Sequence, residues 1–173
     1  FLKPEVESQF KWAGVKVQMF TQTYTVDGTK KLIDEVASYF GKKAEAQRLK
    51  QQIDVALKQV KKLKSSPKVL FIYARGMGAL SVAGNGTSVK SLIELAGAQN
   101  AVNDFDNFKP LTPEALVAAN PDYILLFDSG WESIDGTAGL LKIPGVAQTN
   151  AGKKKQFITM DGAMLTGFGP RVG

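Results

Sequence analysis

The 173-residue sequence contains neither cysteine nor histidine. Without cysteine the chain forms no disulfide and offers no thiolate to a metal ion. Without histidine it lacks the commonest metal ligand and the commonest general base of proteins. No apolar run approaches the roughly 18 residues that a membrane-spanning helix requires. Within these residues the sequence therefore excludes active sites that depend on a thiolate or an imidazole.

Nucleotide-binding and esterase motifs are missing as well. The segment Gly76-Met77-Gly78 begins like a dinucleotide-binding fingerprint, but Ser81 stands where the third glycine belongs. No Walker A lysine follows a glycine-rich loop, and there is no G-x-S-x-G nucleophile elbow. Asp104 and Asp106 could bind a hard cation, although aspartates in loops more often form turns. The chain is therefore predicted to be no enzyme and to hold no catalytic cofactor.

Basic residues outnumber acidic ones, 22 to 16, and many lysines lie in two clusters. One cluster consists of Lys61, Lys62, Lys64 and Lys68, and the other is Lys153–Lys155. Neither contains the interleaved aromatic side chains that a platform for single-stranded nucleic acid uses. We interpret both clusters as solvated surface, and we expect no nucleic-acid partner.

Strand and helix patterns alternate from Lys68 onward. Short apolar runs at Val69–Tyr73, Tyr123–Phe127 and 156–160 are bounded by turn signals, as in strands covered on both faces by helices. Helical patterns lie between them, at Ser88–Ala96, at 112–120 and at Gly136–Leu141. In the second of these, Thr112 can cap the helix and Asn120-Pro121 ends it. This alternation predicts an α/β, Rossmann-like lobe with a largely parallel sheet.

The first part of the chain has a different pattern. A short helix is expected at Pro4–Trp12 and a strand at residues 15–19, and such a pair cannot bury its apolar faces alone. A helix from Asp27 to the cap at Gly41 follows, and then a helix at Lys42–Lys64 about 34 Å long. A helix of this length could form a rigid connection between two lobes, and a coiled-coil segment is the alternative interpretation. We expect residues 1–24 to be the end of an N-terminal α/β lobe and residues 25–64 to be a helical connector between two lobes. Residues 65–173 are expected to form a C-terminal α/β lobe that is incomplete at its end.

Three loops are predicted to follow the main strands and to share one edge of the sheet, namely Arg75–Gly78, Asp128–Trp131 and Asp161–Arg171. Ligands of open α/β sheets bind at this edge. Arg75 and Arg171 can each grip a carboxylate with two parallel hydrogen bonds. The expected ligand-binding residues are Arg75, Gly76, Met77, Gly78, Trp131, Met164, Phe168 and Arg171. Such a set suits a flat, largely apolar ligand with carboxylates, although each apolar residue taken singly also suits a core.

The sequence resembles haem-binding periplasmic proteins, which deliver haem to bacterial ABC-type importers. The resemblance runs from about Trp12 to Gly173 and is carried by VLFIYARGMG, VAGNGTSVKSLIELAG, NAV, LTPEALVAANPDYILLF, ITMDG and LTGFGPR. The helix–Pro-Asp–strand element is shared with the wider class that binds siderophores and cobalamin. The combination of VAGNGT with GFGPR points to the haem branch.

The resemblance implies a periplasmic protein that carries haem as transported ligand between two lobes and docks on an inner-membrane permease. Arg75 and Arg171 would then contact haem propionates or line the cleft, with a structural ion pair as the alternative for Arg171. The axial iron ligand in this family is commonly an N-lobe tyrosine, and Tyr24 and Tyr73 are the phenols weighed for that role here. A siderophore or corrinoid ligand, an α/β enzyme with catalytic groups elsewhere in the protein, and an interaction module remain alternatives.

Overall fold

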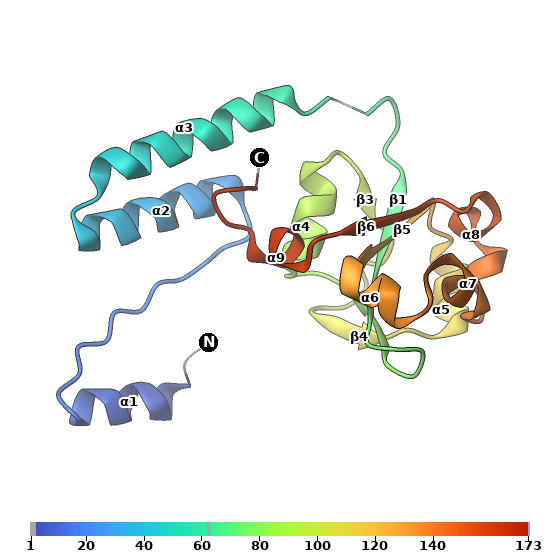
Figure 1. Ribbon diagram of the computed structural model, residues 1–173, viewed down its shortest axis with the longest axis horizontal. Coiled ribbons are helices and arrows are strands. Elements are labelled where there is room, and N and C mark those ends of the chain that lie inside the picture. Colours follow the sequence, from blue (N-terminus) through green and yellow to red (C-terminus); the bar gives the residue numbers. More distant parts are fainter. Residues whose placement is uncertain (1–2, 62, 173) are drawn as a thin grey trace.

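The computed structural model describes residues 3–61 and 63–172, which form a helical arm and an α/β lobe (Figure 1). The arm contains α1 (Pro4–Trp12), α2 (Val26–Phe40) and α3 (Lys43–Gln59). The strands of the lobe are β1 (Lys68–Ala74), β2 (Leu80–Ala83), β3 (Gln99–Asn100), β4 (Phe108–Pro110), β5 (Tyr123–Phe127) and β6 (Phe157–Met160). Its helices are α4 (Ser88–Leu95), α5 (Pro113–Ala119), α6 (Asp128–Ser133), α7 (Gly136–Lys142), α8 (Asn150–Lys154) and α9 (Gly162–Gly167), with a 3₁₀ turn η1 at Val146–Gln148.

The helix α1 stands apart from the lobe, and none of its residues is buried (Figure 1). Trp12 is 91% exposed. The predicted helix is correct, but the strand predicted from Val15 to Met19 is wrong, because residues 15–23 form no regular element. Among the described residues no strand lies beside this segment to share backbone hydrogen bonds, and an isolated strand is not stable.

The helices α2 and α3, which fall within the predicted connector 25–64, lie side by side (Figure 1). Thr25 caps α2 by accepting a hydrogen bond from the Gly28 N–H at 2.9 Å. Gly41 ends α2 in the left-handed region at φ 68°, as the sequence predicts. Ion pairs join the two helices, Lys50 with Asp34 at 2.7 Å and Lys30 with Asp54 at 2.5 Å.

The helix α3 is shorter than predicted. It ends at Gln59 rather than Lys64, so its 17 residues span about 26 Å. Val60 and Leu63 are 47% and 50% exposed, so the apolar stripe beyond Gln59 has little surface to pack on. Lys62, which belongs to the predicted helix and to the first lysine cluster, lies outside the described residues.

The sheet has the strand order β4-β2-β1-β5-β6, with β3 beside the start of β1. The strands β1, β3, β5 and β6 are parallel, whereas β2 and β4 pair antiparallel. Phe71 lies opposite Leu125, and Leu126 lies opposite Thr159. The predicted α/β class with a largely parallel sheet is confirmed, and the antiparallel pairing of β2 and β4 is an addition that the sequence did not reveal.

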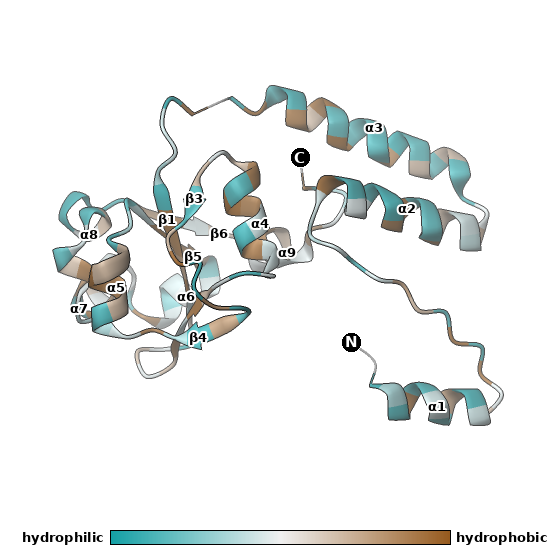
Figure 2. Cartoon of the chain, turned by 180° about the vertical axis from the view of Figure 1, so that it is seen from behind, coloured by the Kyte–Doolittle hydropathy of each residue, from teal (hydrophilic) through white to brown (hydrophobic). Residues whose placement is uncertain are grey.

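Helices cover both faces of the sheet, and apolar residues of the strands lie between them (Figure 2). On one face, Leu70, Ile72 and Leu126 pack with residues of α5–α8. On the other face, Phe71 and Leu125 pack with residues of α4 and α9. The buried strands therefore alternate between two cores, which is why their sequences read as unbroken apolar runs.

The stretch from Leu111 to Gly130 contains two elements that the sequence predicts correctly, α5 and β5, and one helix that it does not predict, α6. The Thr112 hydroxyl accepts a hydrogen bond from the Ala115 N–H at 3.2 Å, and Asn120 ends α5 at φ 40°. Both features are predicted correctly, as is β5. Asp128 was expected to open a loop but begins α6, where Gly130 lets the helix approach the Ala74 carbonyl closely. The first turn of this helix is thus placed by tertiary packing.

Asp122 joins the start of β1 to α8. The Lys68 N–H and the Asn150 side-chain amide both donate to its carboxylate at 3.0 Å. The Lys68 backbone hydrogen bond, then the one from Asn150, lower the pKa of Asp122 from its ordinary value, and they outweigh the opposing effect of burial. The carboxylate therefore stabilises the fold above the pKa of the unfolded state, and that contribution is lost as pH falls through the lower, folded-state pKa.

Replacing Asp122 by asparagine is expected to reduce the free energy of unfolding by about 1 kcal/mol at pH 7. The difference between parent and variant should shrink as pH falls from about 4, where the unfolded chain begins to protonate, through the lower folded-state pKa, where the folded parent loses its charge as well. Urea unfolding at a series of pH values measures this difference. A loss that is the same at pH 7 and at the acid end would contradict the stabilising role of the charge.

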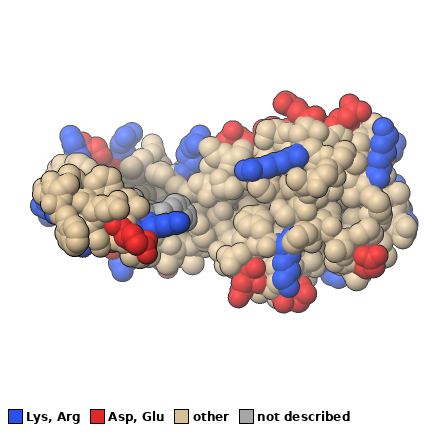
Figure 3. All heavy atoms as spheres, turned by 90° about the horizontal axis from the view of Figure 1, so that it is seen from below, with Lys and Arg blue, Asp and Glu red and all other residues tan. Residues whose placement is uncertain are grey.

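Charges of both signs are interspersed on the face seen from below (Figure 3). The lysines of the second cluster, Lys153–Lys155, are exposed at the end of α8, a helix that the sequence analysis missed. Within residues 3–61 and 63–172, no helix combines the length and the apolar character needed to cross a membrane.

Candidate functional site

The predicted ligand-binding edge begins where three parallel strands end. Ala74 ends β1, Phe127 ends β5 and Met160 ends β6. Because these strands are neighbours and parallel, the segments that follow them start at one edge of the sheet, as predicted. The segments are a tight turn after β1, the helix α6 after β5 and the helix α9 after β6.

The turn after β1 is held against α6. Arg75 and Ala79 close it with a backbone hydrogen bond of 3.1 Å, and Gly76 adopts the left-handed region at φ 76°. The Gly76 N–H donates to the Ser133 hydroxyl at 3.0 Å, and that hydroxyl donates to the Gly130 carbonyl at 2.7 Å. The amide of Gly76 is therefore occupied within the protein. Gly78 faces open space, and Met77 is 46% exposed.

Arg75 and Tyr73 form a pair at this edge. The Arg75 Nε donates to the Tyr73 hydroxyl at 2.6 Å, and the guanidinium lies 4.9 Å from the centre of the phenol ring. The ring itself packs edge-on against Phe127 at 5.4 Å and tilted against Phe108 at 6.4 Å. Arg75 remains exposed, so the N–H groups on its two terminal nitrogens can reach a ligand.

A shallow hollow of about 460 Å³ lies beside this pair. Its walls combine aromatic and aliphatic side chains with two cations, and they include Tyr73, Arg75, Leu80, Phe108 and Lys109. Lys109 is stacked over Phe105 at 4.7 Å, which holds its charge near the hollow. Phe108 and Lys109 were not predicted to line this hollow, because the short strand β4 that carries them was not predicted. The signal available for Tyr73 was its spacing of two residues from Arg75, which places both on one side of an extended strand.

The other predicted site residues are more dispersed. Trp131 is half-buried in α6 and packs against Phe157 at 6.1 Å, on the α5–α8 side of the sheet. Met164 in α9 is 46% exposed. Phe168 is only 2% exposed and packs against Tyr24 at 5.9 Å. Arg171 is exposed and lies beyond α9, in a turn whose flanking residues Phe168 and Val172 pack in one cluster with residues of α2 and α3. This packing of the segment after Gly167 against the helical arm is not predicted from the sequence.

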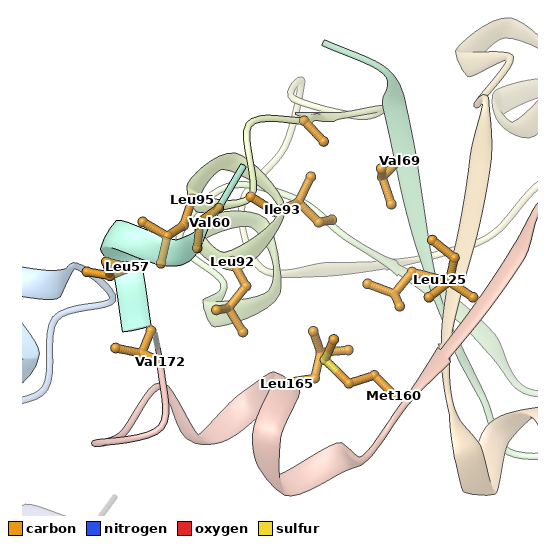
Figure 4. Close-up of a pocket in the computed structure, with 13 residues that line it drawn as sticks. Leu57, Val60, Val69, Leu92, Ile93, Leu95, Leu125, Met160, Leu165 and Val172 are labelled. Carbon is orange, nitrogen blue, oxygen red and sulfur yellow. The ribbon is translucent and has the colours of Figure 1, made fainter. Parts of the chain in front are cut away.

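A second hollow, of about 280 Å³, lies between the end of α3, the helices α4 and α9, and the strands β1, β5 and β6 (Figure 4). Every side chain that lines it is apolar, including Leu92, Leu125, Met160 and Leu165. Small-molecule sites combine such walls with a few polar groups that fix orientation. This second hollow lacks those groups, and none of the predicted site residues lines it. The hollow beside Arg75 and Tyr73 is therefore the better candidate site.

The remaining motifs have structural roles. In VAGNGT, the Gly84 N–H and the Asn85 N–H donate to carbonyls of residues 107 and 105, both at 2.8 Å. Thr87 caps α4 by accepting from the Lys90 N–H at 3.2 Å. Within the described ranges, no group of three or more acidic side chains is placed to hold a metal ion, Asp104 and Asp106 included.

The sequence of this chain matches a known protein family. A family model described as periplasmic binding protein matches residues 3–164. The chain belongs to this family. The family consists of binding proteins rather than enzymes, and a curated relative from Bacillus subtilis is named as an uncharacterized ABC transporter substrate-binding lipoprotein. That relative is 25% identical over 169 residues, which are 95% of this chain and 52% of the relative.

Several solved structures are similar to this chain. The periplasmic heme-binding protein RhuT from Roseiflexus sp. RS-1, in apo form, is 38% identical with a TM-score of 0.88, over 98% of this chain and 66% of that chain. BhuT in complex with two hemes is 34% identical with a TM-score of 0.91 and the same coverage. HutB of Vibrio cholerae is 27% identical with a TM-score of 0.85, over 98% and 68%. The predicted resemblance to haem-binding periplasmic proteins is thus confirmed, and the chain spans about two thirds of their length.

Proposed function

We propose that this chain forms part of a periplasmic solute-binding protein that binds haem and delivers it to an ABC-type importer in the inner membrane. The Arg75–Tyr73 pair beside a partly aromatic hollow is the observation that carries the proposal. Haem is a flat apolar ring with two carboxylates, so it requires an apolar wall and a nearby cation. The similarity to RhuT and BhuT supports haem over the siderophores and corrinoids bound by other members of the wider class.

In this proposal the parts of the site have distinct roles. The Arg75 guanidinium, fixed on Tyr73, binds a propionate through its terminal N–H groups. Met77 and Met164 are exposed and supply adaptable apolar contacts, while Gly76 and Gly78 keep the turn compact. Trp131 supports the edge from the α5–α8 side, and Phe168 anchors the segment that presents Arg171 as a second propionate contact.

The proposed division of the chain follows the same family pattern. We assign 1–24 to the end of an N-terminal lobe, 25–64 to a connector and 65–173 to a C-terminal lobe. The exposed apolar side chains of the first segment, Trp12, Val15 and Met19, support its belonging to another lobe. Haem would then bind between the lobes, with the sheet edge that carries Arg75 as one wall.

Haem titration of the full-length mature protein tests the proposal. We expect a saturable shift of the Soret band at micromolar haem or below, and no comparable response to cobalamin or a ferric siderophore. Tight binding of one of those ligands without a Soret response would overturn the choice of haem. In the same titration, Tyr73→Phe retains the ring and removes the phenol oxygen. Altered visible bands of the bound haem would identify that oxygen as an iron ligand, whereas unaltered bands limit its role to holding Arg75.

A further inference from the structure

The turn that carries Arg171 is built on the connector. Gly169 to Val172 form a β-turn closed by a backbone hydrogen bond of 3.0 Å, with Pro170 at its second position. Phe168, just before the turn, and Val172, its last residue, are 2% and 8% exposed and pack in one cluster with Ile53 of α3. Arg171 is thus exposed between two buried anchors that contact helices of the arm as well as the lobe.

Two side chains, one just before the connector and one in its first helix, hold the backbone of the same segment. The Phe168 carbonyl accepts hydrogen bonds from the Thr29 hydroxyl at 3.1 Å and from the Gln22 side-chain amide at 3.0 Å. The Gln22 amide also donates to the Gly167 carbonyl at 2.9 Å. Thr29 is 1% exposed, so its hydroxyl has little access to water. Its position in the first turn of α2 ties this hydrogen bond to the connector helix.

Phe168 adopts a backbone conformation that a bulky residue rarely takes. Its φ of 40° and ψ of 45° place it in the left-handed region. Such a conformation is unfavourable for a residue with a large side chain and persists where the surroundings fix it. Here two hydrogen bonds to the carbonyl and a buried ring hold it. The reversal at Phe168 directs the chain from α9 toward the connector.

We propose that Thr29 and Gln22 are positioning residues for Arg171. By fixing the Phe168 carbonyl they hold the turn 169–172 in place and couple the position of Arg171 to the geometry of the connector. A change in the angle between arm and lobe therefore moves Arg171 relative to Arg75, which is carried by the sheet. The consequence for haem rests on the proposed function, whereas the anchoring of the turn does not.

Limited cleavage by an arginine-specific protease tests the anchoring without any ligand. Within these residues the arginines are Arg48, Arg75 and Arg171, so Arg75 serves as an internal reference. In the full-length protein, Thr29→Val is expected to raise the rate of cleavage after Arg171 about threefold to tenfold, because one hydrogen bond that holds the closed turn is lost. Gln22→Ala should act in the same direction.

The exposed residues Thr137 and Gln148 provide matched controls, since Thr137→Val and Gln148→Ala make the same chemical changes in α7 and η1, on the α5–α8 side of the sheet. Neither control should change cleavage after Arg171. An unchanged rate in Thr29→Val and Gln22→Ala would overturn the proposal. An equal rise at Arg75 and Arg171 would also overturn it, because it would show general destabilisation.

A double-mutant cycle tests the consequence for ligand binding. Thr29→Val is expected to weaken haem binding about threefold to tenfold in the parent protein and to have no effect in the Arg171→Ala background. An equal loss in both backgrounds would overturn the positioning role. Absence of haem binding by the parent would contradict the proposed function alone, and the protease experiment would then decide the anchoring by itself.

Discussion

Replacing Arg75 and Arg171 together by alanine is expected to weaken haem binding by about a hundredfold. Hydrogen bonds to charged groups contribute about 1.5–3 kcal/mol, and the lower value applies here because both arginines are exposed. The two contributions should add, since the arginines lie on different parts of the fold, and about 3 kcal/mol corresponds to roughly two decades in affinity. Haem titration of the full-length protein, monitored at the Soret band, measures the change.

The matched control is Arg48→Ala, because Arg48 is also exposed but lies on α3, away from the ligand edge. Its affinity for haem should equal that of the parent. Arg75→Lys is more informative still. Lysine keeps the positive charge but lacks the planar fork that both pairs with Tyr73 and binds a carboxylate at two points. We therefore expect Arg75→Lys to retain only part of the parent protein's affinity for haem. Unchanged affinity in the double alanine variant would assign both arginines a purely structural role.

The sheet could be predicted from sequence because its strands carry their own signals. The runs at β1 and β5 are apolar without interruption, and Thr112, Asn120 and Gly41 mark helix ends through local backbone chemistry. The elements that were missed lack such signals. The strand β4 is short and exposed, and it exists only because β2 offers it an edge to pair with. The helix α3 ends early because its apolar stripe beyond Gln59 lacks a packing partner, and the sequence alone does not reveal the presence or absence of such a partner.

The candidate site likewise contains residues that local sequence signals place and residues that only distant contacts place. Arg75 could be located because it follows a buried strand directly, and parallel strands bring their carboxyl ends to one edge. Arg171 also follows a predicted strand, but its place is fixed by Gln22 and Thr29, which lie 146 and 139 residues before Phe168. No local sequence pattern predicts hydrogen bonds between residues so far apart. The hydrogen bond between Arg75 and Tyr73 is compatible with their spacing in the sequence, but it is established only by the structure.

The largest expected loss of stability comes from Phe71→Ala. Phe71 is fully buried in the centre of β1, opposite Leu125, and its ring packs edge-on against Phe127 at 4.9 Å. Removing a buried phenylalanine ring costs about 3–5 kcal/mol, through lost burial and through the cavity that remains. For a chain of this size we expect the melting temperature to fall by about 6 to 20 °C.

Urea and thermal unfolding followed by circular dichroism measure this loss. Phe40→Ala makes the same chemical change at a residue that is 65% exposed, at the end of α2, and should cost less than about 1 kcal/mol. An equal loss in both variants would show that the α4–α9 face does not form the core described. Because Phe71 lies on the same side of β1 as Tyr73 and packs against Phe127, which also supports the Tyr73 ring, the variant should loosen the Arg75–Tyr73 pair as well. The stability of this face and the geometry of the proposed site therefore depend on the same aromatic packing.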